Sequence, residues 1–447
     1  MNEKFLKYRS DYPDFIYKSY TYNIDDNLNI NYNYIISGLE EFNHKIIIPK
    51  EYIKNSYDKD YLDYIIFNIG MIELINYIKC TCSYNIIVEC GYLDDIQIKF
   101  FKKLYYKGLG ELLFRNNISI MCDELFNIKC LGDKIKLSNI NYNGYGNLIC
   151  VGGGKDSCVS LELLKDEDNS CLVINPKNVN IECCRVSGYD DNNIIKVQRI
   201  IDKKIIDINN KGFLNGHIPL SSVIAFISYL ITYLSNRKNI VLSNEASANQ
   251  STVIGTDINH QYSKTYEFEC DFREYVKYTF NLDINYFSLL RGLSEFNIAK
   301  MFSHYKKYHN VFKSCNLGSK NSKWEWCCNC PKCLFIYIIL SPFLSREELI
   351  SIFGDNLLDR EDLLDMFKEI VGYSDNKPFE CVGTYEEARY AISLIIKKNE
   401  KLDYLVRYYK DNYELYLDEN SITKYNEINN LGVYYNNLVK KELDKYV

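Results

Sequence analysis

The pattern of apolar and polar positions divides the chain into two regions that meet near residue 147. In the first region, His44–Pro49 and Tyr84–Gly91 are short apolar runs typical of strands, and Ile96–Asn117 has helical spacing interrupted by glycine. The turn-forming residues Tyr142–Asn147 mark the change. From Leu148 onward the pattern predicts strands and helices in alternation.

This second region predicts a parallel sheet. The expected strands are Leu148–Val151, Cys171–Asn175, Lys204–Ile208 and Asn239–Asn244, and the expected helices are Ser157–Lys165, Asn192–Ile201 and Pro219–Asn236. Alternation at this spacing places helices on the sheet faces and ligands beyond the carboxyl ends of the strands. After Tyr266 the pattern is mostly helical, with capping-box spacings that begin helices at Ser345 and Thr384.

The chain has 447 residues. A single hydrophobic core rarely supports a chain of this length, so several domains are expected. We predict an α/β protein whose central part is a parallel-sheet, Rossmann-like domain. The predicted divisions are an N-terminal α/β domain at 1–143, the parallel-sheet domain at 144–310, and a four-cysteine metal site leading into a helical region at 311–447.

Composition narrows the class of protein. Hydrophobic residues make up 47% and charged residues 25%, as in soluble globular proteins. The longest apolar stretch, Val223–Leu234, is too short to cross a bilayer, so we expect no membrane partner. The first residues contain no secretory signal, and seventeen cysteines without one predict reduced thiols in the cytoplasm. A net charge of −6 without a basic run argues against a nucleic-acid partner.

Three consecutive glycines, Gly152, Gly153 and Gly154, precede the helix that Lys155 begins. The spacing fits neither a Walker A loop nor the dinucleotide-binding fingerprint. Without Cβ atoms, backbone N–H groups approach an anion closely, and the helix N-terminus adds its dipole. We therefore predict that Gly152, Gly153, Gly154, Lys155, Asp156 and Ser157 bind phosphate, the alternative being a tight turn without a ligand.

A long polar segment follows the last expected strand, from Ser243 to Tyr275. Structureless segments of this length are usually functional or disordered. Its acids, bases and amides suit a polar, multiply charged substrate, the alternative being a solvated surface loop. The candidate substrate-binding residues are Asn244, Asn249, Gln261, Tyr262, Ser263, Lys264, Glu267 and Arg273.

Two of the five histidines, His217 and His260, lie in polar loops around the expected site. Histidine titrates near working pH and can accept and return a proton, so each is a candidate catalytic base, although a structural role is also open. Glu245 and Lys155 are rival candidates, because burial would raise the pKa of the carboxyl and lower that of the ammonium.

Four cysteines near the C-terminal region have the spacing of a metal site. Cys327, Cys330 and Cys333 form C-x-x-C-x-x-C, and Cys315 precedes them. Four thiolates suit a structural zinc ion, while an iron–sulfur cluster or free buried cysteines remain alternatives. Cys328 could replace a neighbouring ligand.

The stretch GGGKDS resembles the PP-loop of the ATP-pyrophosphatase family, whose motif is Ser-Gly-Gly-x-Asp-Ser, with Gly152 in place of the first serine. Nearly the whole chain is similar to the family of UDP-N-acetyl-α-D-muramoyl-L-alanyl-L-glutamate epimerases. Cys328 and Asn329 depart from that pattern, where Gly-Lys is expected. The matching stretches include NGHIP (215–219), SNEASAN (243–249), NHQYSKTYEFE (259–269), WCCNCPKC (326–333) and KPFECVGT (377–384).

The resemblance implies that ATP and Mg²⁺ adenylate the α-carboxylate of the terminal L-glutamate of UDP-MurNAc-L-Ala-L-Glu, with release of pyrophosphate. Epimerisation at Cα and hydrolysis would then give AMP and the D-glutamyl product for peptidoglycan synthesis. It adds Asn175 to the nucleotide-binding residues and implies that Zn²⁺ is structural. Two alternatives stay open: another adenylating enzyme, such as an amide-forming ligase like 7-cyano-7-deazaguanine synthase or a thiolase, and a non-catalytic binding protein.

Overall fold

The structure is a computed structural model that describes residues 2–54, 56–253, 255–315, 317–318, 325–374 and 377–446. Its described strands form one sheet in the order β10-β9-β6-β7-β8-β3-β2-β1-β4-β5. The strands are β1 (Asp14–Ile24), β2 (Asn27–Ile36), β3 (Glu40–Pro49), β4 (Asn85–Val88), β5 (Asn127–Cys130), β6 (Tyr145–Cys150), β7 (Asn169–Ile174), β8 (Ile194–Ile200), β9 (Arg237–Leu242) and β10 (Asn285–Ser288).

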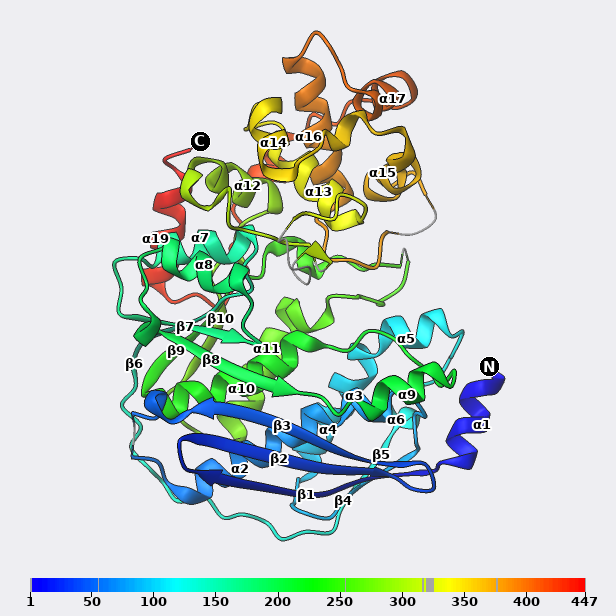
Figure 1. The fold of residues 1–447 in the computed structure, drawn as a ribbon, viewed down its shortest axis with the longest axis vertical. Coiled ribbons are helices and arrows are strands. Elements are labelled where there is room, and N and C mark those ends of the chain that lie inside the picture. Colours follow the sequence, from blue (N-terminus) through cyan, green and yellow to red (C-terminus); the bar gives the residue numbers. More distant parts are fainter. Residues whose placement is uncertain are drawn as a thin grey trace.

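The helices gather around and beyond this sheet (Figure 1). Those of the first half are α1 (Glu3–Asp11), α2 (Lys59–Glu73), α3 (Ile75–Ile78), α4 (Asp95–Gly108), α5 (Gly110–Arg115), α6 (Cys122–Leu125), α7 (Lys155–Leu163), α8 (Asn178–Val186), α9 (Lys204–Asn210) and α10 (Leu220–Ser235). Those of the second half are α11 (Tyr266–Thr279), α12 (Glu295–His304), α13 (Pro331–Leu340), α14 (Arg346–Phe353), α15 (Leu364–Ile370), α16 (Tyr385–Lys398), α17 (Tyr404–Asn412), α18 (Glu419–Thr423) and α19 (Val433–Leu443).

The sheet has parallel strands on both sides of an antiparallel meander, and on the smaller side β4 and β5 run parallel to β1. β10, β9, β6, β7 and β8 run parallel, β8 then pairs antiparallel with β3, and β3, β2 and β1 form a meander. Figure 1 shows helices α13 to α17 gathered at one end of the molecule and the meander at the other, with the parallel strands between them. The sheet is therefore continuous across residue 143, where the sequence analysis placed a division.

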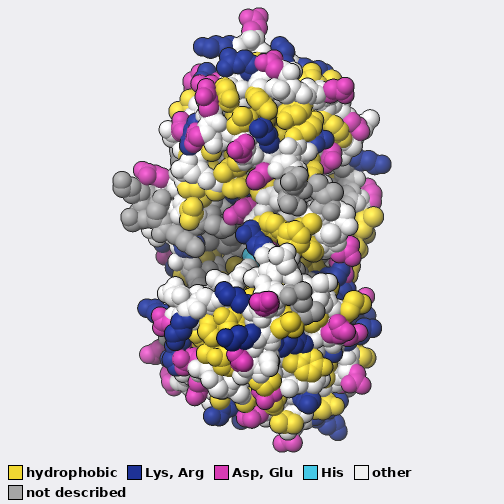
Figure 2. All heavy atoms as spheres, turned by 90° about the vertical axis from the view of Figure 1, so that its right-hand side faces the viewer, with side chains coloured by type: hydrophobic (Ala, Val, Ile, Leu, Met, Phe, Trp, Pro, Cys, Tyr) yellow, Lys and Arg dark blue, Asp and Glu magenta, His cyan; other side chains and the backbone are white. Residues whose placement is uncertain are grey.

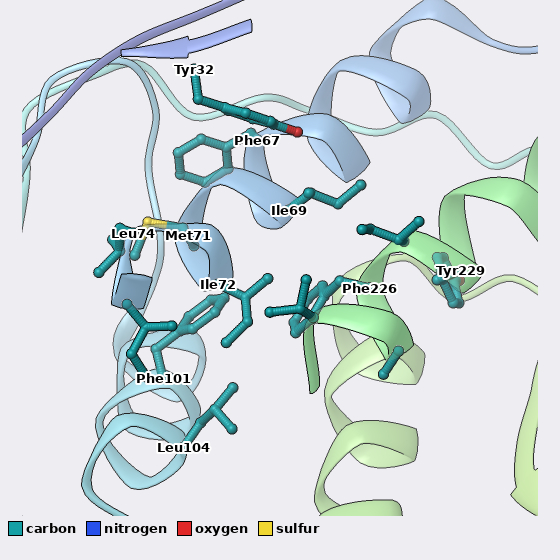
Figure 3. Packing of buried hydrophobic residues seen from close by; sticks show 14 of the residues in the cluster. Tyr32, Phe67, Ile69, Met71, Ile72, Leu74, Phe101, Leu104, Phe226 and Tyr229 are labelled. Carbon is teal, nitrogen blue, oxygen red and sulfur yellow. The ribbon is translucent and has the colours of Figure 1, made fainter. Parts of the chain in front are cut away.

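The parallel strands are covered on both faces, which explains their nearly continuous apolar sequences. Leu148 packs in a core with α2, α4 and α10, and the next residue, Ile149, packs in a second core with α7, α12 and α13. Figure 3 shows part of the first core, where Ile72 of α2 lies beside Phe226 of α10 and Phe67 of α2 lies beside Tyr32 of β2. Successive side chains of a strand point to opposite faces, so each parallel strand serves both cores.

A buried ion pair joins the N-terminal block to the parallel strands. The Arg199 guanidinium, on β8, donates from Nε and Nη2 to the two carboxylate oxygens of Glu73, on α2, at 2.6 Å each. Asn76 accepts a third hydrogen bond from Arg199 at 2.9 Å. Burial raises the pKa of the Glu73 carboxyl, but Arg199 and His44 outweigh it and hold the pKa well below its usual range. Such a pair fixes the relative position of its two elements, because either charge alone would be buried without a partner.

Two expected elements of the parallel region are wrong. Asn192–Ile201, predicted as a helix, contains β8, and Lys204–Ile208, predicted as a strand, lies in α9. In apolar runs this short, periodicity does not distinguish a strand from a helix. Pairing with β7 and β3 makes β8 a strand, whereas the Asp202 carboxylate accepts from the Lys204 backbone N–H at 3.0 Å and starts a helix.

The other elements expected here are confirmed, including α7 after the glycines and the long helix α10. Ser345 and Thr384 both form capping boxes, with Glu348 and Glu387 respectively. Ile96–Asn117 forms α4 and α5, separated near Leu109. In the part of the chain that the structure describes, no helix combines the length and apolar character needed to cross a membrane.

Candidate active site

A cavity of about 360 Å³ lies at the carboxyl ends of β6, β7 and β9. The chain passes from β6 to β7 and β8 on one side and later returns to β9 on the other side of β6. A sheet of this kind opens a crevice where the strand order reverses, and ligands bind there. Figure 2 shows the molecule hollowed at mid-height on one side, with a histidine side chain (cyan) visible in the hollow.

The glycine turn forms one wall of the cavity. Gly153 has φ +83°, and a Cβ atom there would lie 2.8 Å from Val179 Cγ1. A Cβ on Gly154 would lie 2.9 Å from Ser314 Oγ, whereas one on Gly152 would meet nothing within 4 Å. Conformation and close approach therefore require glycine at Gly153, whereas at Gly154 a Cβ atom would displace the Ser314 hydroxyl and at Gly152 it would face open space.

Two polar side chains at the start of α7 lie close to the glycine turn. Ser157 Oγ accepts from the Gly153 N–H at 3.1 Å and donates to the Gly154 carbonyl at 2.9 Å. Asp156, in the first helical turn, lines the cavity. The helix N-terminus favours a negatively charged ligand at this position.

Lys155 points away from the cavity lining into a buried carboxylate cluster. Its ammonium is fully buried and pairs with both Asp156 and Glu295 of α12. Burial alone would lower the pKa of this ammonium, but the two carboxylates raise it above its usual range. Burial raises the pKa of Glu295 to about 8, with Lys155 opposing it and Asp156 and Glu245 adding to it. Asp156, Glu245 and Glu295 place one carboxylate oxygen each within 4.8 Å of one another.

The lining of the cavity also includes three lysines and a thiol. Lys264, Lys313 and Lys332 line the cavity together with Cys381. Lys264 Nζ donates to Cys381 Sγ at 3.2 Å, and Lys332 Nζ donates to the carbonyl of the same cysteine. Lys313 is adjacent to the glycine turn, because its backbone N–H donates to the Gly153 carbonyl at 2.9 Å. An anion in the cavity would therefore meet ammonium groups as well as the helix N-terminus.

The two candidate histidines lie beside each other. The ring centroids of His217 and His260 are 4.0 Å apart. His260 Nδ1 lies 2.5 Å from a carboxylate oxygen of Glu111, on α5. Burial alone would lower the pKa of His260, but hydrogen bonds to Cys381 and Glu111 raise it to about 9. Burial and the neighbouring His260 lower the pKa of His217 to about 4, so the pair contains one protonated and one neutral ring at neutral pH.

Of the expected nucleotide- and substrate-binding residues outside the glycine turn, the structure brings Asn244 and Lys264 to the cavity. The Asn175 side chain instead accepts from the Arg199 N–H at 2.6 Å, and Asn249 accepts from the Tyr266 N–H at 2.8 Å. Both amides therefore hold backbone turns in place.

Five further candidates also lie elsewhere. Glu267 pairs at the surface with Lys103 and Lys107, and Arg273 donates to the Tyr286 carbonyl. Tyr262 packs against Phe268 in the core. Gln261 and Ser263 are buried beside it, and neither lines the cavity among the described residues.

Sequence reasoning missed Glu295, Lys332 and Cys381. Cys381 stands in a stretch, KPFECVGT, that matched the epimerase pattern, but no spacing assigned it a role. The Glu387 carboxylate accepts from the Thr384 N–H and the Glu295 N–H, at 2.7 Å each, and so fixes the start of α16 beside α12. The capping contact with Thr384 is local, but the contact with Glu295 joins residues far apart in the chain, and no local pattern encodes it.

The four expected metal-ligating cysteines meet, with their sulfur atoms all within 4.8 Å of one another. Cys330 Sγ lies 3.5 Å from Cys333 Sγ and 3.8 Å from Cys315 Sγ, and Cys327 Sγ lies 3.6 Å from Cys333 Sγ. Tetrahedral ligation at a Zn–S distance of about 2.3 Å puts sulfurs about 3.8 Å apart. The cluster is consistent with zinc. Cys328 lies outside it, with its thiol directed to the Phe353 carbonyl.

Comparison with known proteins gives one consistent result. Residues 7–289 match the MurL N-terminal domain, and residues 311–421 match the MurL C-terminal domain. Three relatives are each named UDP-N-acetyl-alpha-D-muramoyl-L-alanyl-L-glutamate epimerase. They come from a Micromonospora species (33% identity over 74% of each chain), Xanthomonas oryzae pv. oryzae (31% over 79% of each) and Salinispora tropica (35% over 73% of this chain and 72% of the relative).

No solved structure matches the chain. The two domain matches together cover most of its length, and they include both the glycine turn and the four cysteines. The relatives exceed 30% identity over about three quarters of the chain. The chain therefore belongs to the MurL family of epimerases.

Proposed function

We propose that this protein converts the terminal L-glutamate of UDP-MurNAc-L-Ala-L-Glu to D-glutamate, with ATP as co-substrate, during synthesis of peptidoglycan precursors. The three relatives carry the name of an epimerase acting on this compound, and the chain shares their family. The adenylating mechanism rests on the cavity. A cytoplasmic location and the absence of a nucleic-acid partner remain predictions.

The observation that carries the ATP-dependent step is the glycine turn at the start of α7, which shares one cavity with Lys264, Lys313 and Lys332. Backbone N–H groups, a helix N-terminus and ammonium groups all favour polyphosphate. This supports membership of the PP-loop family, in which ATP is cleaved between its α- and β-phosphates. The substrate carboxylate would attack the α-phosphorus, and pyrophosphate would leave.

Adenylation suits the chemistry of epimerisation. A carboxylate strongly resists loss of its α-proton, because the product would carry two negative charges on neighbouring atoms. A neutral acyl-adenylate removes that obstacle. After the proton leaves, the planar enolate takes a proton on its other face, and hydrolysis releases AMP and the D-glutamyl product.

The carboxylate cluster fits a magnesium ion. Asp156, Glu245 and Glu295 supply closely spaced oxygens, the ligand type that Mg²⁺ prefers. Bound there, Mg²⁺ would neutralise phosphate charge. In the structure the Lys155 ammonium pairs with Asp156 and Glu295, so it would have to move aside for Mg²⁺ to bind their oxygens.

The four-cysteine cluster fits zinc, as a closed site with a structural role. It lies at the start of α13, where Cys330 is the N-cap and Pro331 the first helical residue. Cys315 also lines the cavity. Zinc held by these four thiolates would tie the segment after Lys313 to α13, and so support the part of the cavity lining that Lys313 and Lys332 supply.

The test is incubation of the protein with ATP, Mg²⁺ and UDP-MurNAc-L-Ala-L-Glu, followed by acid hydrolysis and chiral analysis of glutamate. D-glutamate should form with stoichiometric AMP and pyrophosphate, and omission of ATP should abolish it. Epimerisation without ATP would refute the adenylate. Formation of a glutamyl amide on addition of ammonium, in place of D-glutamate, would favour the ligase alternative.

A further inference from the structure

Cys381 is the thiol of the cavity that the epimerisation scheme leaves without a role. It stands in the loop before α16 and lines the cavity together with Asp156 and Ser157. Its Sγ accepts a hydrogen bond from Lys264 Nζ at 3.2 Å, and His260 also hydrogen-bonds to it. It is therefore part of a cluster of polar groups.

Next to the Cys381 thiol, His260 and Glu111 form a hydrogen-bonded pair of side chains. His260 interacts with Cys381, and its Nδ1 donates to the Glu111 carboxylate at 2.5 Å. Arg115 in turn donates from Nε to the other oxygen of Glu111 at 2.7 Å. A thiol, an imidazole and a carboxylate in this order form the arrangement by which proteins activate cysteine. The Glu111 contact fixes the orientation of the ring.

The charged groups around the thiol are mostly positive. The charged groups next to the Cys381 thiol are Lys264 of the loop segment 262–264, Lys332 of α13 and His260. His217 and Glu111 act on the thiol through His260. Burial alone would raise the pKa of the Cys381 thiol, but Lys264, His260 and Lys332 lower it to about 6. Thiolate is then the main form at neutral pH, and His260 is an imidazolium.

The neighbouring thiols provide a contrast. Cys150 also lines the cavity, yet burial raises the pKa of its thiol to about 12. Burial likewise raises the pKa of Cys122, a half-buried thiol outside the cavity. Of these three cysteines, Cys381 is the one whose surroundings favour the nucleophilic, basic form.

We propose that Cys381, held by Lys264 and the His260–Glu111 pair, is the base that removes the Cα proton of the activated glutamyl residue. The assignment rests on the proposed epimerase function. The thiolate shares its cavity with the phosphate-binding turn, and Cα is one bond from the carboxyl group that would be adenylated there. The histidines expected as bases from the sequence become positioning groups, because His260 is protonated and His217 stands behind it.

The proton balance of the step is simple. The Cα–H bond breaks, an S–H bond forms on Cys381, and the electron pair moves through Cα into the carbonyl group to give the enolate. The Lys264 ammonium stands beside the thiolate and offsets negative charge as it moves to the substrate. A solvent water molecule then gives a proton to the opposite face of Cα, and Cys381 returns to thiolate by losing its proton to the hydroxide that is left, so that no net proton is gained or lost.

The experiment uses the full-length protein with ATP, Mg²⁺ and UDP-MurNAc-L-Ala-L-Glu in D₂O. Pyrophosphate release and α-deuterium incorporation are followed separately for wild type, Cys381→Ala, Cys381→Ser and the control Cys122→Ser. General-base catalysis contributes about 10²–10⁴-fold. Both Cys381 variants should therefore lose at least about 100-fold in exchange and keep pyrophosphate release within about tenfold, and Cys122→Ser should match wild type.

A second readout does not depend on turnover. Iodoacetamide labelling of Cys381, read by peptide mass spectrometry, should have its midpoint near pH 6 in wild type and shift upward in His260→Asn, which removes a positive neighbour. Labelling that rises only above pH 8 in wild type would overturn the thiolate. Retained exchange in both Cys381 variants, each melting like wild type, would overturn the base.

The outcomes separate this inference from the proposed function. Exchange that depends on Cys381 but proceeds without pyrophosphate release refutes adenylation and supports the base. Pyrophosphate release with exchange that is indifferent to Cys381 supports adenylation and refutes the base. A wild type that leaves Cα unexchanged refutes the epimerase function and with it this role for the thiol.

Discussion

Replacing Gly153 by alanine should destabilise the protein, whereas the same replacement at Gly152 should not. Alanine at Gly153 must adopt φ +83°. For a residue with a Cβ atom this conformation lowers the free energy of unfolding by roughly 1–2 kcal/mol. That Cβ would also lie 2.8 Å from Val179 Cγ1, and overpacking adds about 1–3 kcal/mol. The expected loss is therefore about 2–5 kcal/mol.

The magnitude converts to a change in melting temperature. Unfolding entropy is about 2.1 cal/mol/K per residue, or about 0.9 kcal/mol/K for the whole chain. Gly153→Ala should then lower Tm by about 2–5 °C if the chain unfolds as one unit. At Gly152 a Cβ atom meets nothing within 4 Å and φ is not positive. Gly152→Ala should leave Tm unchanged or raise it slightly, because alanine restricts the unfolded chain.

Differential scanning calorimetry of the two variants beside wild type measures this difference. Gly152→Ser belongs in the same series, since it places a hydroxyl in the cavity where the PP-loop motif has serine. It should melt like wild type and release pyrophosphate at least as fast. Equal losses of Tm in Gly152→Ala and Gly153→Ala, or no loss in either, would refute the geometry assigned to the turn.

Three further predictions concern chemistry. Asp156→Ala should abolish pyrophosphate release without a change in the far-UV circular dichroism spectrum, and wild-type release would refute the nucleotide site. Elemental analysis should find about one zinc per chain, and chelation or Cys330→Ser should lower Tm before activity falls, because closed thiolate sites couple metal binding to folding. The rate of α-deuterium exchange should fall as pH drops through about 6, where the Cys381 thiolate is protonated, and again as pH rises through about 9, where His260 loses its proton. A rate that is flat from pH 5 to 10 would contradict both assignments.

The amino-acid sequence by itself determined the features that depend on neighbouring residues. Three glycines in a row before Lys155 predicted an open turn at a helix start, and the structure has it. The helix caps at Ser345 and Thr384 and the proline at the start of α10 are equally local. The close spacing of Cys327, Cys330 and Cys333 predicted a cluster because thiols so near in sequence can reach one ion.

Tertiary structure decided what local pattern leaves open. Ile-rich runs of similar composition became β8 and α9, because only β8 finds strand partners on both sides, one of them β3 from the N-terminal block. Glu295 and Cys381 joined the site across long stretches of chain, through contacts with Lys155 and Lys264. Their pKa values follow from burial and from charges brought by other elements. Those quantities exist only once the chain is folded, so no spacing along the sequence could have revealed that neighbouring charges lower the pKa of the Cys381 thiol.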